Sequence, residues 1–200
     1  MTMTGMSSVY LACGDVGGTN SRFLLYELDK NVRYNNVVAG HKAPGTLIHS
    51  AKYQNEEWMS FDDVLRSFLR DAKISGRHEA PYIACFAVAG PVKSNSASLT
   101  NRNAWKIDGT DIEKAFGIHK VLIVNDFMAV GYGLLTIDDV LECVTLQKGL
   151  RDPKAPIACI GAGTGLGECF LTPGEDGAYR CYPTEGGHAD FAPRYRTTDR

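Results

Sequence analysis

The fold of this chain is decided by the stretch Val121-Leu122-Ile123-Val124-Asn125-Asp126, which leads into the apolar, glycine-containing residues 127–135. Four consecutive apolar residues are typical of a buried strand, and residues 127–135 are predicted to form a helix. Open α/β sheets bind ligands at the carboxyl ends of their strands. We therefore expect Asn125 and Asp126 to lie at a ligand site on which other motifs of the chain converge.

The composition is that of an ordinary soluble globular protein. Of the 200 residues, 44% are hydrophobic and 22% are charged, and the formal net charge is −2. The charges are well mixed, so no basic face indicates a nucleic-acid partner. No apolar run is long enough for a signal peptide or a membrane span. The six cysteines are widely spaced without a Cys-x-x-Cys pair, which favours reduced, buried thiols in a cytoplasmic protein.

Periodicity and turn residues predict the remaining elements. Apolar residues at helical spacing predict a helix at residues 61–74, capped by Ser60, and a shorter helix at 110–116 that ends at Gly117. Residues 42–56 are polar and are predicted to form an irregular surface loop. Strands are expected at residues 9–13, 22–28, 34–40, 82–88, 98–101, 157–160, 168–172 and 178–182.

Two glycine-rich turns occur in similar surroundings. The first is Gly14-Asp15-Val16-Gly17-Gly18-Thr19-Asn20, and the second is Gly161-Ala162-Gly163-Thr164-Gly165-Leu166-Gly167. An apolar strand precedes and follows each turn, so we interpret both as hairpins in two lobes built on one plan. Neither is a P-loop or a good Rossmann fingerprint, and either one alone is also explained as a plain hairpin.

Taken together, the two turns favour a nucleotide site. Where glycine leaves room, backbone N–H groups can point at phosphate, and two hairpins that face each other could hold a polyphosphate from both sides. Asp15 is expected to hold Mg²⁺ through water, because Mg²⁺ keeps most of its hydration. The residues expected to bind the nucleotide are Asp15, Gly17, Gly18, Thr19, Asn20, Gly163, Thr164 and Gly165.

Asp126 is the candidate catalytic residue. Phosphoryl transfer to a hydroxyl needs a carboxylate that accepts the hydroxyl proton, and a helix N-terminus favours the ionised carboxylate. Asn125 could donate to and accept from a sugar hydroxyl. The alternative is that Asp126 only caps the helix.

The third constellation is Glu185-Gly186-Gly187-His188. Paired glycines let a loop turn tightly, and Glu185 and His188 could then bind adjacent sugar hydroxyls, each of which donates and accepts. The alternatives for His188 are zinc binding and a buried structural histidine. Zinc is disfavoured because Cys181 stands alone, without a cysteine cluster.

The chain divides into two predicted domains. Residues 1–146 form a small α/β domain. Residues 147–200 form the start of a second, larger α/β domain, and their first ten, 147–156, are linker-like. Only three strands follow the linker, and a parallel or mixed sheet left bare on one face is not expected to be stable. The sequence therefore predicts a fragment of a longer protein.

In the order in which they occur, these motifs resemble the bacterial-type glucokinase family. The similarity extends from about residue 11 to residue 193 and includes the two glycine turns, Asn125-Asp126-Phe127 and Glu185-Gly186-Gly187-His188. It also includes Ala89-Gly90-Pro91 and the segment Leu99-Thr100-Asn101 with Trp105. Each motif alone is weak, whereas all of them in order are specific.

The resemblance implies an actin-like (ribonuclease H-like) ATPase fold with a small and a larger α/β domain. It implies transfer of the ATP γ-phosphate to the 6-hydroxyl of glucose, the first step of glycolysis, with ATP and Mg²⁺ required. Asp126 would be the base, and Asn125, Asp126, Glu185 and His188 would bind glucose. The chain ends before the family's last sugar-binding glutamate and its adenosine site. A homodimer is left open.

Other functions compete with a glucokinase. A kinase for a related hexose and a sugar-sensing regulator would use the same fold. A DNA-binding regulator would carry a helix-turn-helix, and the roughly ten residues before the first glycine turn are too few for one. An actin- or chaperone-like ATPase without a sugar site would have no reason to combine Asn125-Asp126 with Glu185 and His188.

Overall fold

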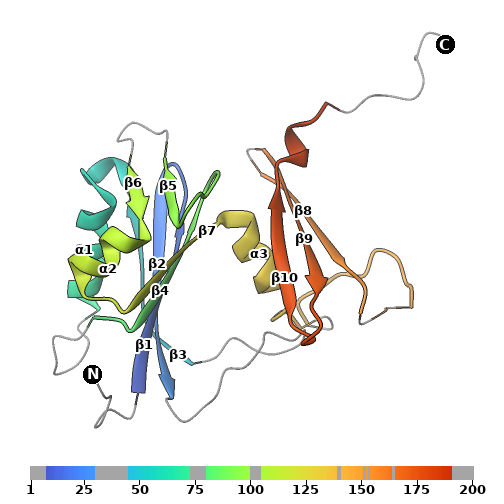
Figure 1. Ribbon diagram of the computed structural model, residues 1–200, viewed down its shortest axis with the longest axis horizontal. Coiled ribbons are helices and arrows are strands. Elements are labelled where there is room, and N and C mark those ends of the chain that lie inside the picture. Colours follow the sequence, from blue (N-terminus) through green and yellow to red (C-terminus); the bar gives the residue numbers. More distant parts are fainter. Residues whose placement is uncertain are drawn as a thin grey trace.

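The computed structural model describes residues 8–29, 45–72, 80–99, 105–138, 141–150, 152, 154–163 and 165–190. A five-stranded sheet and a three-stranded sheet lie side by side with helix α3 between them (Figure 1). The strand predicted at residues 34–40, and Thr164 of the second glycine turn, lie outside the described residues.

The larger sheet has the strand order β3-β2-β1-β4-β7. Strands β1, β4 and β7 are parallel, while β2 is antiparallel to both β1 and β3. Val16 is aligned with Val88, and Val88 with Asn125, so the three parallel strands end level with one another. The strands are β1 (Ser8–Val16), β2 (Asn20–Asp29), β3 (Thr46–Gln54), β4 (Ile83–Val88) and β7 (Lys120–Asn125).

Helices α1 (Phe61–Asp71) and α2 (Gly109–Phe116) cover one face of this sheet (Figure 1). Phe23 of β2 lies in the core between the sheet and these helices. The centroids of four aromatic rings lie 5.3–5.9 Å from the centroid of its ring: Tyr53, Phe61, Phe68 and Phe86. The short strands β5 (Ser96–Ser98) and β6 (Lys106–Asp108) pair with each other, and β6 leads directly into α2. Trp105, just before β6, is buried.

The residues at the helix ends explain where α1 begins and where α2 begins and ends. The Ser60 hydroxyl accepts the Asp63 N–H at 3.2 Å, which confirms the predicted cap. Asp108 caps α2 by accepting the Thr110 and Asp111 N–H groups. Gly117 ends α2 in the left-handed conformation, with φ 68°, which glycine adopts without a steric penalty.

The prediction of an irregular loop at residues 42–56 is wrong. Residues Thr46–Gln54 form β3, and the one-turn helix η1 (Asn55–Glu57) follows it. On this edge strand His49, Ala51 and Tyr53 are partly buried on the core side of the sheet, while the residues between them are exposed. The polar residues of the solvent face hid the alternation in the sequence, and pairing with β2 stabilises the strand.

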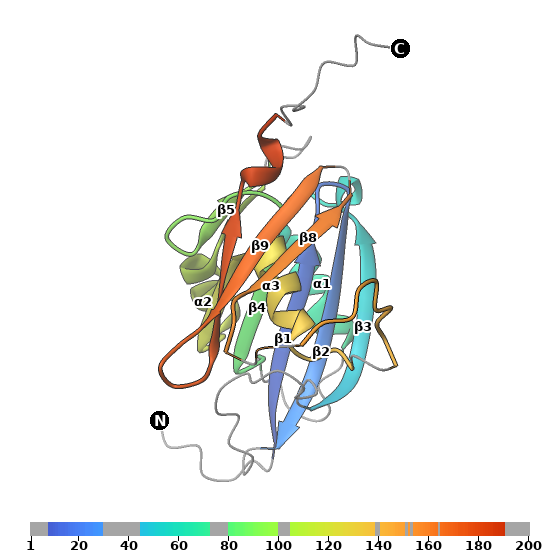
Figure 2. The same cartoon turned by 90° about the vertical axis from the view of Figure 1, so that its right-hand side faces the viewer.

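The smaller sheet is antiparallel, with the order β10-β9-β8, so the expectation of a parallel or mixed sheet is wrong. Its strands β8 (Ile157–Ala162), β9 (Leu166–Pro173) and β10 (Tyr179–Thr184) are joined by short turns, which can connect only antiparallel neighbours. Helix α3 (Asp126–Leu134) lies against this sheet, and Figure 2 shows β8, β9 and β10 in front of it. Leu135, Cys169, Leu171, Tyr179 and Cys181 form the core of this contact.

All six cysteines are free, as predicted. Burial raises the pKa of the Cys159 and Cys169 thiols to about 11. The predicted burial holds fully for Cys169 and Cys181, whereas Cys13, Cys85 and Cys159 are partly buried and Cys143 is exposed. Within the described part of the chain, no helix is long and apolar enough to cross a membrane.

Candidate active site

The loops that follow β1 and β4 and the start of α3 after β7 meet at one edge of the larger sheet. The loops begin at Gly17 and Ala89, α3 begins at Asp126, and the three parallel strands before them end level. The Ala89 N–H donates to the Val16 carbonyl at 3.1 Å, which joins the first two loops. This is the strand edge at which open α/β sheets bind ligands.

A cavity of about 590 Å³ lies between this edge and the smaller sheet. Its volume is within the range of small-molecule sites, roughly 300–1,000 Å³. Residues of all three predicted constellations line it: Gly17, Gly18, Asn125, Asp126, Gly163, Gly165, Glu185 and His188. Asp15, Thr19 and Asn20 are not part of this lining.

The first glycine turn is shorter than predicted. Asp15 belongs to β1 and Asn20 to β2, and the Gly17 N–H donates to the Asn20 carbonyl at 2.9 Å to close the turn. Asp15 is exposed two residues before the turn. A lone exposed carboxylate suits Mg²⁺, which keeps several waters and needs few protein ligands. The described residues contain no group of three or more metal ligands.

Asn55 braces this turn, and the sequence reasoning missed it. Its side-chain Nδ2 donates to the Gly17 carbonyl at 2.8 Å, and its Oδ1 accepts the Ser21 hydroxyl at 2.8 Å. Its backbone N–H donates to the Thr19 carbonyl at 2.9 Å. Asn55 is 2% exposed and lies within the supposed loop. No local signal identifies it, because its partners are more than 30 residues away.

Asn125, not Asp126, caps α3. The Asn125 Oδ1 accepts the Met128 N–H at 3.2 Å, and its Nδ2 donates to the Gly90 carbonyl at 3.1 Å. Asp126 is the first residue of the helix, and its Oδ1 accepts the Phe127 N–H at 2.9 Å. The N-cap residue is therefore Asn125, and Asp126 also accepts a first-turn N–H; a role of Asp126 beyond the helix end stays a prediction.

The second glycine turn faces the cavity from the smaller sheet. The Gly163 N–H donates to the Gly165 carbonyl at 2.8 Å, so the turn is tight. The outer glycines of the motif, Gly161 and Gly167, belong to β8 and β9 and are paired with each other. The two hairpins thus line one cavity from opposite lobes, as the sequence predicted.

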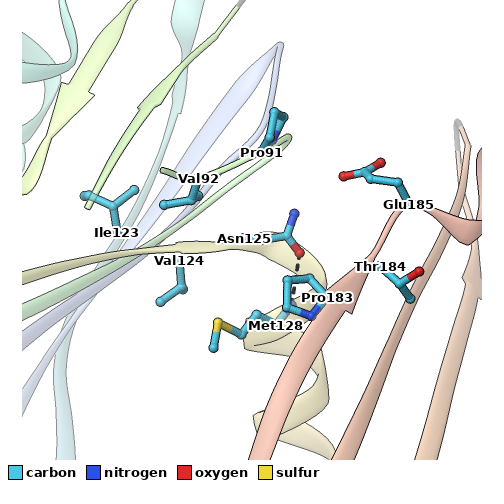
Figure 3. Close-up of a pocket in the computed structure, with 9 residues that line it drawn as sticks. All are labelled: Pro91, Val92, Ile123, Val124, Asn125, Met128, Pro183, Thr184 and Glu185. Atoms are coloured by element: carbon cyan, nitrogen blue, oxygen red, sulfur yellow. Dashed lines mark hydrogen bonds between the residues drawn. The ribbon is translucent and has the colours of Figure 1, made fainter. Parts of the chain in front are cut away.

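Glu185 immediately precedes the short helix η2 (Gly186–His188), and His188 is the last residue of that helix. The His188 Nε2 is 3.3 Å from a Glu185 carboxylate oxygen, and both side chains are exposed. Gly187 is needed for close packing, because a Cβ there would collide with the Leu166 carbonyl. Figure 3 shows Glu185 and Asn125 on opposite sides of an adjoining cavity of about 300 Å³.

Comparison with known proteins identifies the family. A family model described as Glucokinase matches residues 12–200. The chain belongs to the glucokinase family. It is similar to the glucokinase of Nostoc sp., with 39% identity over 184 residues that cover 92% of this chain and 49% of the relative. It is also similar to the Synechocystis sp. glucokinase, with 36% identity and coverage of 95% and 51%.

Solved structures show the same fold. A glucokinase from an Antarctic psychrotroph has a TM-score of 0.72 and 26% identity, and the match covers 94% of this chain and 53% of that one. A glucokinase from Balamuthia mandrillaris in complex with glucose has a TM-score of 0.64 and 19% identity, over 98% and 53%, and supports the fold alone. The fold is the actin-like ATPase fold. This glucokinase-family chain spans about half the length of the curated relatives that it matches.

Proposed function

We propose that the protein containing this chain transfers the γ-phosphate of ATP to the 6-hydroxyl of D-glucose. The observation that supports this most directly is the single cavity lined by both glycine hairpins, by Asn125-Asp126 and by Glu185 with His188. A phosphate-binding element, a carboxylate base and a polyhydroxyl-binding loop are the parts that a sugar kinase requires.

Asp126 is proposed to accept the proton of the attacking hydroxyl. One of its oxygens is engaged by the Phe127 N–H, which fixes the carboxylate and leaves the other oxygen for the sugar. Asn125 keeps one N–H and one acceptor lone pair beyond its bonds to Met128 and Gly90. Glu185 and His188 would bind further hydroxyls from the opposite wall of the cavity.

The glycine turns are proposed to bind the phosphates of ATP by letting them approach the backbone where no side chain intervenes, with Gly17 and Gly18 on one side and Gly163 and Gly165 on the other. Asp15 would hold Mg²⁺ through water, and the ion would supply positive charge to the phosphates. The free cysteines suit a reducing compartment, so we place the protein in the cytoplasm.

The decisive experiment is the Asp126→Asn substitution in a chain that spans the full length of the curated relatives. Asparagine keeps the shape of aspartate but cannot accept the proton, so kcat should fall by about 10²–10⁴-fold while glucose binding, measured by calorimetry, is retained. Asp111→Asn is the matched control, because Asp111 lies in the first turn of α2, outside the cavity. Near-normal turnover of Asp126→Asn would rule out the assigned base.

Sugar selectivity needs a separate assay. ADP release is measured with glucose, mannose, fructose and N-acetylmannosamine at equal concentrations. A glucokinase should give the highest kcat/KM with glucose. A higher value with another sugar would assign the protein to that hexose, and no turnover with any sugar would favour a sugar-sensing regulator.

A further inference from the structure

Phe127, the residue after the proposed base, packs against the second glycine hairpin. A Cβ on Gly161 would lie 2.8 Å from the Phe127 ring, and a Cβ on Gly167 would overlap the ring more severely. These two glycines are cross-strand partners, one residue pair away from the pair that adjoins the turn. The ring therefore occupies a slot that exists because both strands lack a side chain at this level.

The rest of α3 is attached to the same sheet. A Cβ on Gly131 would lie 2.8 Å from the Cys169 sulfur, so helix and sheet approach closely there too. One residue further on, the Tyr132 hydroxyl accepts the Cys181 N–H at 3.2 Å. Phe127 and Gly131 are four residues apart, which places them on one side of the helix, and Tyr132 follows directly after Gly131.

Asn125, two residues before Phe127, belongs to the larger sheet. Asn125 is the last residue of β7, which pairs with β4, and its Nδ2 is bonded to the Gly90 carbonyl. Asp126 thus lies where the chain passes from the larger sheet to a helix attached to the smaller one. The contacts that fix the first turn of α3 therefore set the position of Asp126 relative to the second glycine turn.

We propose that Phe127 is a positioning residue, and that its ring, seated on Gly161 and Gly167, holds Asp126 at a fixed place relative to the second glycine turn. On this inference, which rests on the proposed function, the outer glycines of that motif serve packing, whereas Gly163 and Gly165 at its tip serve the nucleotide. A base displaced by about 1 Å can lose about 10²-fold in rate, so the seat matters for catalysis.

The test is a double-mutant cycle in a chain that spans the full length of the curated relatives. Gly167→Ala introduces the overlap, and Phe127→Leu removes Cε2 and Cζ, two of the three ring atoms that the new methyl group would meet. Gly167→Ala should lower kcat at least about tenfold with glucose KM within about twofold. The double variant should recover most of that loss in kcat and in melting temperature.

Two further substitutions separate the possible causes. Gly133→Ala is on the same helix with open space around its Cβ, so kcat should be unchanged. Gly163→Ala, where a Cβ meets no atom closer than 3.9 Å, should raise the KM for ATP, and Phe127→Leu should not reverse that effect. This contrast distinguishes a packing glycine from a phosphate-binding glycine.

The inference is overturned if Gly167→Ala impairs the enzyme equally with and without Phe127→Leu, because Gly167 would then serve the nucleotide directly. It is also overturned if Gly167→Ala leaves kcat unchanged. Failure of the proposed function is recognised separately, by turnover that survives Asp126→Asn. The double-mutant cycle in melting temperature needs no turnover. Additive effects of Gly167→Ala and Phe127→Leu on the melting temperature would by themselves refute the packing of Phe127 on this glycine.

Discussion

Asn55 allows a quantitative test of how the first glycine turn is held. Asn55→Ala removes the bonds to the Ser21 hydroxyl and the Gly17 carbonyl, both 2.8 Å long, of which the first is buried and the second partly buried. Each is worth about 1 kcal/mol net, so the free energy of unfolding should fall by about 2 kcal/mol. If the Gly17 bond of about 1 kcal/mol is needed for the binding geometry, ATP affinity should fall about fivefold.

The matched control is Ser21→Ala, which loses one of the two bonds and keeps the bond between Asn55 and Gly17. It should cost about 1 kcal/mol in the free energy of unfolding and leave the KM for ATP unchanged. Unfolding is followed in urea, and KM values for ATP and glucose are measured separately. A KM for ATP that Asn55→Ala does not alter, or an equal rise for glucose, would refute this reasoning.

Three further predictions concern other parts of the molecule. Gly14→Ala should lower the free energy of unfolding by about 1–3 kcal/mol, because its Cβ would lie 2.6 Å from the Phe23 ring, and urea unfolding checks this. Hydrogen bonds from the first turn of α2 lower the pKa of Asp108 below its usual value. Its stabilising effect is therefore present above about pH 4 and is lost as the pH falls through the lowered pKa, and Asp108→Asn should reduce the fall in melting temperature between pH 5 and 2. Iodoacetamide at pH 8 should modify exposed Cys143 well before Cys159, whose pKa is raised to about 11 by burial; equal rates in mass spectrometry would contradict this.

The candidate site was largely predictable because its signals are local. Glycine runs identify both hairpins, and an apolar run followed by Asn125-Asp126 identifies the end of β7. Parallel pairing then brings the strand ends together, which the α/β pattern anticipates. The order of motifs along the chain was enough to indicate the family.

The tertiary structure decided what each residue contacts. Strand β3 depends on pairing with β2, Asn55 on partners 34 and 38 residues away, and the seat of Phe127 on glycines 34 and 40 residues further along the chain. Such contacts leave no periodic trace in the sequence, because they arise only when separate elements pack together. Local chemistry therefore determined which residues form the turns and the polar lining of the cavity, and packing determined which glycines contact Phe127 and which have open space around them.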